Sequence, residues 1–413
     1  MSGTITSDFG RILVHGEFTI REMPNLLAAM YNLTNQKGYK DIELDFTRCT
    51  SAFSSSMLPV AAYSQKYLID KIDISLRLPD DRRMRNIFLN TNWANLIDFR
   101  QHPESTYRGY TQVPAARYTD ASQQHQAVNR ILEIVLSALS SFERSHLTAI
   151  EWAINEITDN VLNHSKSPVG GFVQVTNFNQ RHQLEFSVCD PGVGIPASIR
   201  SNHSDLDSDQ AALDRAIRQG VTRDKAVGQG NGLYGTWRIC QLSEGRFEIH
   251  SGYSSLVSTT REGLHVRSER IPFNGSLVTA RIGYGVPLDL KQALRFGEKT
   301  SESVDYVELH YDEDETGNIR FKIQDESNGF GSRAAGEPVR RKLSNLSRMN
   351  NDGRIIIDFS DVPVVSSSYA DEVFGKLFVA MGPLAFSSKF DFRNVDPLTK
   401  DLIDGAIRQR TRQ

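Results

Sequence analysis

Residues 155–164 read NEITDNVLNH, and this stretch decides the fold of the middle of the chain. A helix that turns by about 100° per residue sorts the neighbouring side chains onto two faces. One face is polar and comprises Glu156, Asn160, Asn163 and His164. Another face is apolar and comprises Ile150, Ile154, Ile157 and Val161. The pattern fits the solvated side of an amphipathic helix, but a carboxylate one turn before an amide can also serve a hydrated Mg²⁺ and an attacking water.

Two glycine-containing stretches follow this helix. In residues 188–196, VCDPGVGIP, an expected strand ends at Asp190, and a turn with Gly192 and Gly194 follows. A carboxylate at a strand end can accept a hydrogen bond from an adenine amino group, and glycines permit close approach of a ligand. The alternative is an ordinary Asp-Pro-Gly turn, which would have the same sequence. Residues 228–235, GQGNGLYG, precede a helical pattern and leave backbone N–H groups for phosphate. They are neither a P-loop nor a dinucleotide-binding fingerprint, because no Gly-Lys-Ser/Thr follows and no strand immediately precedes them.

Taken together, the helix with Glu, Asn and His, the DxGxG turn and the GxGxGL stretch resemble the N, G1 and G2 boxes of the GHKL superfamily. This group holds the Bergerat-fold ATP-binding domains of gyrase, Hsp90, MutL and histidine kinases, and the boxes occur here in the same order within residues 125–285. The resemblance implies that Glu156 is the general base or water-orienting group, that Asn160 binds Mg²⁺ and that Asp190 recognises adenine. It places a larger set around ATP: Asn160, His164, Asp190, Gly192, Gly194, Thr222, Gly228, Gly230, Asn231, Gly232 and Leu233.

The resemblance also bears on the lid and on the branch of the superfamily. Residues 195–227 would form a mobile lid, and Gly220-Val221-Thr222 resembles the lid of the kinase branch. His164 matches the His of the N box, where a phosphate contact and a structural role are both open. The long helical pattern before this box is similar to that of anti-sigma-factor kinases and histidine-kinase catalytic domains. However, Gln126 and Ala127 follow His125, so no phosphoacceptor histidine is evident.

Both ends of the chain alternate strand and helix patterns, which is typical of small α/β domains. Residues 42–56 echo residues 355–368, because each passes from a strand ending in Asp-Phe to three serines and then into a helix. We infer a duplicated fold. Residues 357–378 resemble STAS and STAS-like domains, and the N-terminal copy resembles them more loosely. In the C-terminal copy we expect strands at 305–310, 318–323, 354–359 and 389–393.

The serine runs have two interpretations. In the anti-sigma network that the resemblance brings in, a STAS antagonist is phosphorylated on a serine at the start of a helix, and Ser54–Ser56 and Ser366–Ser368 occupy that region. Serine is also a favoured helix N-cap, worth about 1 kcal/mol. Two charged runs are expected to be solvated: the acidic residues 312–315 in a turn and Arg340-Arg341-Lys342 on a helix face.

Composition limits the classes of partner. The 413 residues include 47 Lys+Arg and 50 Asp+Glu, a formal charge of −3, so no basic field favours nucleic acid or an anionic membrane. The three cysteines lie far apart, which argues against a zinc ribbon or a disulfide framework and favours a reducing cytoplasm. No secretory signal and no apolar run of about 18 residues is evident, so we expect no membrane span.

The sequence therefore predicts an α+β protein: a central Bergerat α/β sandwich with a small α/β STAS-like domain at each end. The expected ranges are 1–112, 121–287 and 300–413, with a polar linker over 100–120. The expected function is that of a Mg-ATP-binding signalling or regulatory protein whose slow ATP hydrolysis switches interactions of the STAS-like domains, with a protein partner or self-association, including a homodimer. The alternatives are an anti-sigma-type serine kinase that phosphorylates a STAS-like domain in the same chain or in a partner, and an ATP-gated scaffold without catalysis. Glu156 does not separate hydrolysis from phosphotransfer.

Overall fold

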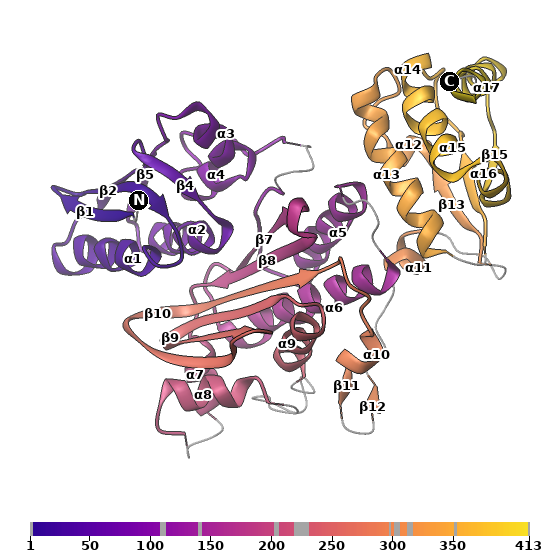
Figure 1. Ribbon diagram of the computed structural model, residues 1–413. Coiled ribbons are helices and arrows are strands. Elements are labelled where there is room, and N and C mark those ends of the chain that lie inside the picture. Colours follow the sequence, from indigo (N-terminus) through magenta and orange to yellow (C-terminus); the bar gives the residue numbers. More distant parts are fainter. Residues whose placement is uncertain are drawn as a thin grey trace. The chain divides into compact units, whose positions relative to one another are not determined.

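The computed structural model describes residues 3–107, 113–138, 143–201, 206–218, 231–296, 299–300, 306–311, 317–350 and 353–411 (Figure 1). The chain divides into two compact units. The first comprises residues 1–131 and 149–302, and the second comprises residues 132–148 and 303–413. Two of the three divisions fall inside helices, α5 (Ala121–Ala138) and α6 (Arg144–Asn160), and the third falls between residues 302 and 303. No helix among the described residues combines the length and apolar character that crossing a membrane requires.

The first unit begins with a small sheet in the order β1-β2-β3-β5, with β4 paired to β2. The strands are β1 (Thr4–Asp8), β2 (Arg11–Phe18), β3 (Asp41–Asp45), β4 (Cys49–Ala52) and β5 (Asp73–Arg77). β2, β3 and β5 are parallel, and their register aligns Ile12, Leu44 and Leu76 in one buried row. The associated helices are α1 (Met23–Tyr31), its π-helical extension η1 (Asn32–Gln36), α2 (Ser54–Ile69), α3 (Arg82–Asn90) and α4 (Trp93–Ile97).

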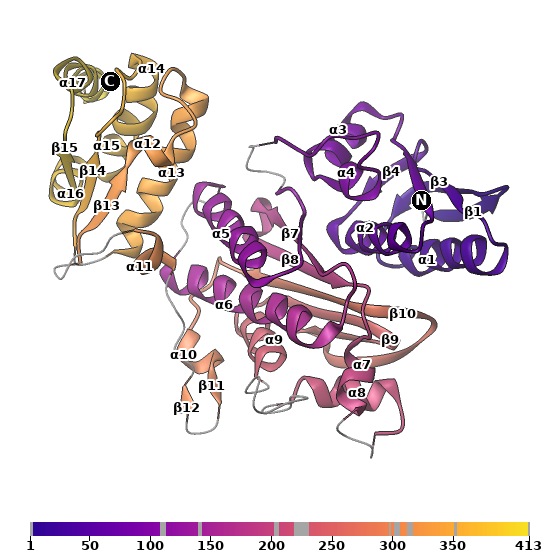
Figure 2. The ribbon, with the colours of Figure 1, turned by 180° about the vertical axis from the view of Figure 1, so that it is seen from behind.

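The second sheet of this unit has five antiparallel strands in the order β6-β7-β8-β10-β9. They are β6 (Ala116–Tyr118), β7 (Gly171–Phe178), β8 (Gln183–Asp190), β9 (Arg246–Thr259) and β10 (Gly263–Gly283). Helices α5 and α6 lie over one face of this sheet (Figure 2). The remaining elements are η2 (Val161–Ser165), η3 (Asn179–Arg181), α7 (Ile195–Arg200), α8 (Asp209–Ala216), α9 (Gly232–Leu242), α10 (Leu290–Ala293), β11 (Arg295–Phe296) and β12 (Lys299–Thr300).

Helix α2 of the N-terminal part covers the other face of the five-stranded sheet. Residues 184–190 of β8 are all buried, although a strand with one solvated face would alternate. Phe172, Cys189 and Leu277 form a row across β7, β8 and β10 and belong to the same hydrophobic cluster as Met57 and Ala61 of α2. Helix α2 packs on all three strands. The N-terminal part and the five-stranded sheet therefore share one core.

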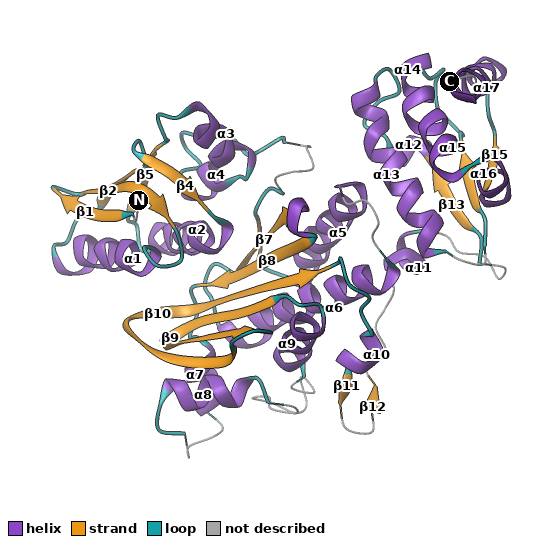
Figure 3. Cartoon of the chain, in the orientation of Figure 1, coloured by secondary structure: helices purple, strands orange, loops and turns teal. Residues whose placement is uncertain are grey.

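The second unit contains a parallel sheet in the order β13-β14-β15, formed by β13 (Ile319–Lys322), β14 (Ile355–Asp358) and β15 (Phe390–Arg393). Helices alternate with these strands along the chain (Figure 3). They are α11 (Tyr306–His310), α12 (Ile323–Glu326), α13 (Arg333–Met349), α14 (Ser367–Ala370), the π turn η4 (Asp371–Gly375), α15 (Lys376–Met381), α16 (Pro383–Lys389) and α17 (Pro397–Thr411).

The two flanking sheets repeat one polar arrangement, which supports the duplicated fold. At the end of β3, Asp45 Oδ1 accepts hydrogen bonds from Thr47 N at 2.9 Å and Thr47 Oγ1 at 2.5 Å. At the end of β14, Asp358 Oδ1 accepts equivalent bonds from Ser360 N at 2.9 Å and Ser360 Oγ at 2.6 Å. Burial opposes ionisation of both aspartates, but these bonds and neighbouring arginines outweigh it and hold each pKa below its usual range.

Three expectations about local structure were wrong. Residues 306–310 of the expected strand at 305–310 form helix α11, in which Tyr306 and His310, one turn apart, stack at 4.9 Å between ring centroids. The expected linker contains β6, a strand of three residues that is too short to show alternation and is held by its pairing with β7. Lys342 is not solvated but 1% exposed, because it lies on the buried face of α13 together with Val339 and Leu346. The acidic residues 312–315 lie outside the described residues.

Candidate functional site

Residues 155–164, NEITDNVLNH, span the C-terminal end of α6 and most of the π turn η2. The four residues of the predicted apolar face are buried, whereas Glu156 and Asn160 are half-buried. Helix α6 ends at Asn160 and continues as the π turn η2, which closes at Lys166 with φ 51°. The wider turn changes the helical periodicity, and Asn163 is exposed while His164 is half-buried.

Glu156 and Asn160 face the first residue of helix α9. A β-carbon on Gly232 would collide with Glu156 Oε2 and would lie 3.4 Å from Asn160 Nδ2, so a larger residue there would displace the Glu156 carboxyl group. Burial, with a smaller contribution from the nearby charge of Asp159, raises the pKa of Glu156 from 4.5 to about 7. A carboxyl group with a pKa near neutrality is suited to accept a proton at physiological pH.

Asp190 is the last residue of β8 and is 2% exposed. Its Oδ1 atom accepts a hydrogen bond of 2.8 Å from Gly192 N. Burial raises the pKa of Asp190 to about 7, against the opposing effects of the Gly192 and Ser276 hydrogen bonds and the charge of Lys66. The carboxylate is thus held by the turn that follows it.

The turn after Asp190 lies against the end of η2. Val193 N donates a hydrogen bond of 2.7 Å to Ser165 O. A β-carbon on Gly192 would collide with that same carbonyl oxygen, and Gly194 has φ 82°, a conformation that favours glycine. The two glycines therefore let the G1-like turn lie directly on the segment that follows Glu156, Asn160 and His164.

The start of α9 connects the site to helices α7 and α8. Asn231 precedes the helix as its N-cap residue, and Leu233 packs against a cluster of Ile199, Ala212 and Ala216. Within the expected lid, residues 195–201 and 206–218 are described and include α7 and α8. Of the predicted ATP-contacting residues, Thr222, Gly228 and Gly230 lie outside the described residues.

The structure thus brings Glu156, Asn160 and Gly232 into contact, and it joins the Asp190 turn to the end of η2. It also adds residues that the sequence analysis missed. Tyr118 of β6 is fully buried, and its hydroxyl donates a hydrogen bond of 3.3 Å to the Thr158 carbonyl of α6. Tyr118 lies in the expected linker, and no local signal in the sequence distinguishes it.

The serine runs differ between the two flanking sheets. Ser54 and Ser56 are buried, and Ser56 Oγ donates a hydrogen bond of 2.9 Å to Phe18 O. Ser366 is the N-cap of α14 and accepts a hydrogen bond of 3.1 Å from Tyr369 N, which confirms the capping interpretation for this residue. Ser367 beside it is exposed.

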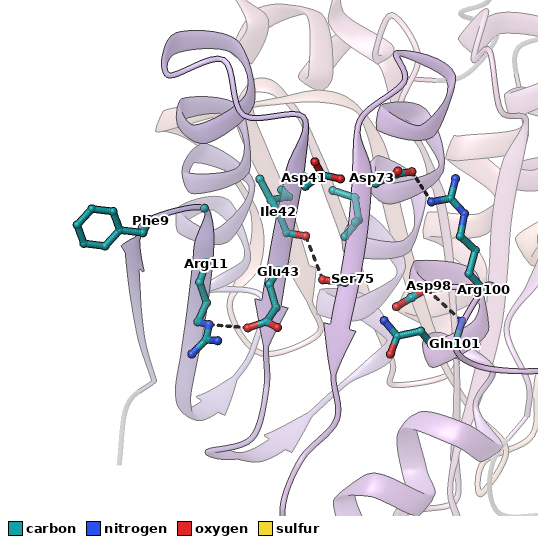
Figure 4. A pocket seen from close by; sticks show the side chains of 12 residues that line it. Phe9, Arg11, Asp41, Ile42, Glu43, Asp73, Ser75, Asp98, Arg100 and Gln101 are labelled. Carbon is teal, nitrogen blue, oxygen red and sulfur yellow. Dashed lines mark hydrogen bonds and ion pairs between the residues drawn. The ribbon is translucent and has the colours of Figure 1, made fainter.

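A polar hollow of about 460 Å³ lies on the N-terminal sheet, on the face opposite the Ile12 row (Figure 4). Two ion pairs line it: Arg11 with Glu43 at 2.5 Å, and Arg100 with Asp73 at 2.7 Å. None of the predicted site residues lines it. We interpret this hollow as a solvated face of ion pairs.

Comparison with known families identifies two parts of the chain. Residues 146–274 match the family described as histidine kinase-, DNA gyrase B-, and HSP90-like ATPase. Residues 335–400 match the family described as STAS-like domain of unknown function (DUF4325). No curated protein matches the chain. The predicted GHKL domain and STAS-like flank are thereby confirmed, and the chain contains an ATP-binding domain of the histidine-kinase-like type together with a STAS-like domain.

Proposed function

We propose that the protein is a Mg-ATP-dependent regulator that hydrolyses ATP slowly and uses nucleotide occupancy to change what its STAS-like domains bind. The observation that carries this proposal is the position of Glu156 and Asn160 against Gly232 at the start of α9, with the buried Asp190 carboxyl in the turn that follows β8. Glycine at 232 lets the Glu156 carboxyl group lie at this contact, where a β-carbon would push it aside.

The residues present fit ATP and Mg²⁺. Ionised Asp190 would accept a hydrogen bond from the adenine amino group, while Gly192 and Gly194 allow close approach of the backbone. The N–H groups at the start of α9 would bind phosphate, and the side-chain oxygen of Asn160 would bind Mg²⁺. The bound metal ion would neutralise negative charge on the phosphate groups.

Glu156 is the residue that we assign to proton transfer. With its pKa raised to about 7 by burial, it can hold a water molecule by a hydrogen bond and accept its proton near neutral pH. Asn160 stands one helical turn later on the same helix, so one rigid element positions both groups. This arrangement serves hydrolysis and would also serve transfer to a hydroxyl group.

The C-terminal STAS-like domain is the part that we assign to partner binding or self-association. Its helix α13 holds the end of α5 through hydrogen bonds from Asn345 Nδ2 to Leu136 O at 2.8 Å and from Arg341 Nη1 to Ala138 O at 2.7 Å. Residues 132–148 of the α5–α6 region belong to the same compact unit. Helix α6 continues from this unit to Glu156 and Asn160, so the helix that carries the site begins in the partner-binding unit.

The test follows the γ-phosphate of labelled ATP on the full chain with Mg²⁺. We expect free phosphate from the wild type, none from Glu156→Gln, and retained ATP binding in that variant. Asp190→Asn should weaken ATP binding itself by at least about tenfold. ATP that fails to bind the wild type would refute the proposal.

A serine kinase is the second candidate, favoured by one observation: Ser367 is exposed at the start of α14. Label retained on residues 366–368 would identify phosphotransfer to the C-terminal domain. Burial of Ser54 and Ser56 argues against these two serines as acceptors. If ATP binds but neither free phosphate nor label forms, the protein is an ATP-gated scaffold. The three buried, unpaired cysteines support a cytoplasmic location.

A further inference from the structure

Helix α2 donates hydrogen bonds to two backbone carbonyl groups near Asp190, one in the turn that follows it and one on strand β10. Lys66 Nζ donates a hydrogen bond of 3.0 Å to Pro191 O, in the residue directly after Asp190. One turn earlier, the Tyr63 hydroxyl donates a hydrogen bond of 2.8 Å to Asn274 O on β10. Both donors come from the N-terminal part of the chain, outside the matched ATPase segment at 146–274.

The Asn274 segment is itself part of the Asp190 environment. Ser276 pairs with Asp190 in the β10–β8 register. Gly275 has φ 142°, and a β-carbon there would collide with Asp190 O, so the two backbones lie in close contact. Ser251 Oγ donates to Gly275 O at 2.5 Å and accepts from Ile195 N at 2.9 Å. The backbone next to Asn274 therefore contacts Asp190, where the turn begins, and is linked through Ser251 to Ile195, where the turn ends.

Packing holds α2 in the place from which it makes these bonds. The Tyr63 ring lies 5.9 Å from the Phe273 ring, and Tyr63 is 9% exposed. At the other end of the helix, the Ser54 and Thr176 hydroxyl oxygens are 3.3 Å apart. The neighbouring α4 adds a buried hydrogen bond of 2.7 Å from Trp93 Nε1 to Gln174 Oε1 on β7. A shift of α2 would therefore carry Lys66 and Tyr63 with it.

We infer that Lys66 and Tyr63 are positioning residues of the nucleotide site, so that the N-terminal STAS-like part sets the affinity of the Asp190 turn for ATP. The inference rests on the proposed function. Neither residue needs to touch the nucleotide, because each acts through a backbone carbonyl beside Asp190. By linkage, ATP binding must restrain α2 to the same degree that α2 favours ATP binding.

Lys66 also acts on Asp190 through its charge. The titratable groups that face Asp190 are Lys66 and Tyr63 of α2, Tyr118 of β6 and Cys189 of β8. Burial raises the pKa values of Tyr63, Tyr118 and Cys189 above their usual ranges, so these three remain neutral near pH 7. Lys66 opposes the burial-driven rise in the pKa of Asp190, and removing it leaves less ionised carboxylate at pH 7.

The test is isothermal calorimetry of ATP binding to the full chain between pH 6 and pH 9. We expect Lys66→Met to weaken binding about fivefold at pH 7 and to shift the midpoint of the pH profile upward, whereas Lys66→Arg restores most of the affinity. Tyr63→Phe, which removes only a hydroxyl, should weaken binding about threefold without moving the midpoint. Lys37→Met, at an exposed site on the same N-terminal part, is the matched control and should bind as the wild type does.

The outcomes separate the inference from the proposed function. If the wild type binds ATP and both Lys66→Met and Tyr63→Phe retain its affinity and pH midpoint, the positioning role is overturned while the proposed function stands. If the wild type binds no ATP, the proposed function fails first. Hydrogen exchange gives an independent measure: ATP should slow amide exchange over residues 54–69 in the wild type and leave it unchanged in Asp190→Asn.

Discussion

Replacing Glu156 with glutamine tests the site through stability and activity together. Glutamine has nearly the same shape as glutamate but carries no charge. Burial raises the pKa of Glu156 from 4.5 to about 7, so the folded wild type binds a proton more tightly than the unfolded chain does. The free energy of unfolding of the wild type should therefore fall as pH rises from about 4.5 to about 7 and then level off. The variant has no such dependence at this position.

The size of the effect follows from the two pKa values. The difference between 4.5 and about 7 corresponds to roughly 3 kcal/mol, which partial exposure of Glu156 to solvent reduces to about 2 kcal/mol. Other groups that titrate in the same range, such as Asp190, contribute equally to both proteins and cancel in the difference. For a unit of this size, about 2 kcal/mol corresponds to roughly 4 °C in Tm.

The assay is differential scanning calorimetry of the full chain without nucleotide at pH 5 and pH 8. We expect the Tm difference between Glu156→Gln and the wild type to be roughly 4 °C larger, in favour of the variant, at pH 8 than at pH 5. In a separate assay with ATP, the variant should release no phosphate. Glu262→Gln, at an exposed position between β9 and β10, is the matched control. A Tm difference that is the same at both pH values would refute the burial argument, and phosphate release at the wild-type rate would refute the catalytic role.

Three further substitutions test other parts of the structure. Asp190→Asn should weaken ATP binding by at least about tenfold in calorimetric titration, since an ionised acceptor is lost; unchanged affinity would remove Asp190 from adenine recognition. Lys342→Met should destabilise the second unit by about 3 kcal/mol in thermal melts, because it leaves Glu326, 2.6 Å from Nζ, buried without its cation, and adding Glu326→Gln should restore part of the loss. Asp358→Asn should destabilise the protein at pH 7 in urea titrations, and the deficit should shrink as pH falls below 3.8, because the pKa of Asp358 is lowered in the folded state; a deficit that persists in acid would contradict this assignment.

The parts of the site that the sequence predicted are those determined by local geometry. Helical periodicity identified the buried isoleucines of α6, and it placed Glu156 and Asn160 one turn apart. The glycine positions were informative because two of them, Gly192 and Gly232, lie where a β-carbon would collide with neighbouring atoms. The glycine motifs themselves are short stretches that the sequence displays. The atoms that the β-carbons would meet, Ser165 O and Glu156 Oε2, come from another segment, so the motif predicts the glycine but not its partner.

The remaining features depend on contacts between distant segments. A basic triplet predicts a solvated helix face, yet Lys342 is buried, and its charge is paired with Glu326 and Glu133, which lie 2.6 and 3.2 Å from its Nζ atom. Similarly, nothing in the sequence around Lys66 indicates that its partner is Pro191, 125 residues later. Pairings of this kind are created by tertiary packing, and single-sequence periodicity carries no information about them.

The two flanking parts, which we infer to be copies of one fold, differ in the exposure of the helix at their serine run. In the N-terminal copy, the 16-residue helix α2 begins with the serine run and packs on the five-stranded sheet, and Ser54 and Ser56 are buried. In the C-terminal copy, the corresponding helix starts with Ser367 exposed and follows Val364, which is 48% exposed. A helix whose face is already covered cannot exchange partners without uncovering the ATPase core. We therefore expect nucleotide-dependent partner exchange to use the C-terminal copy, while the N-terminal copy acts as a fixed part of the ATP-binding domain.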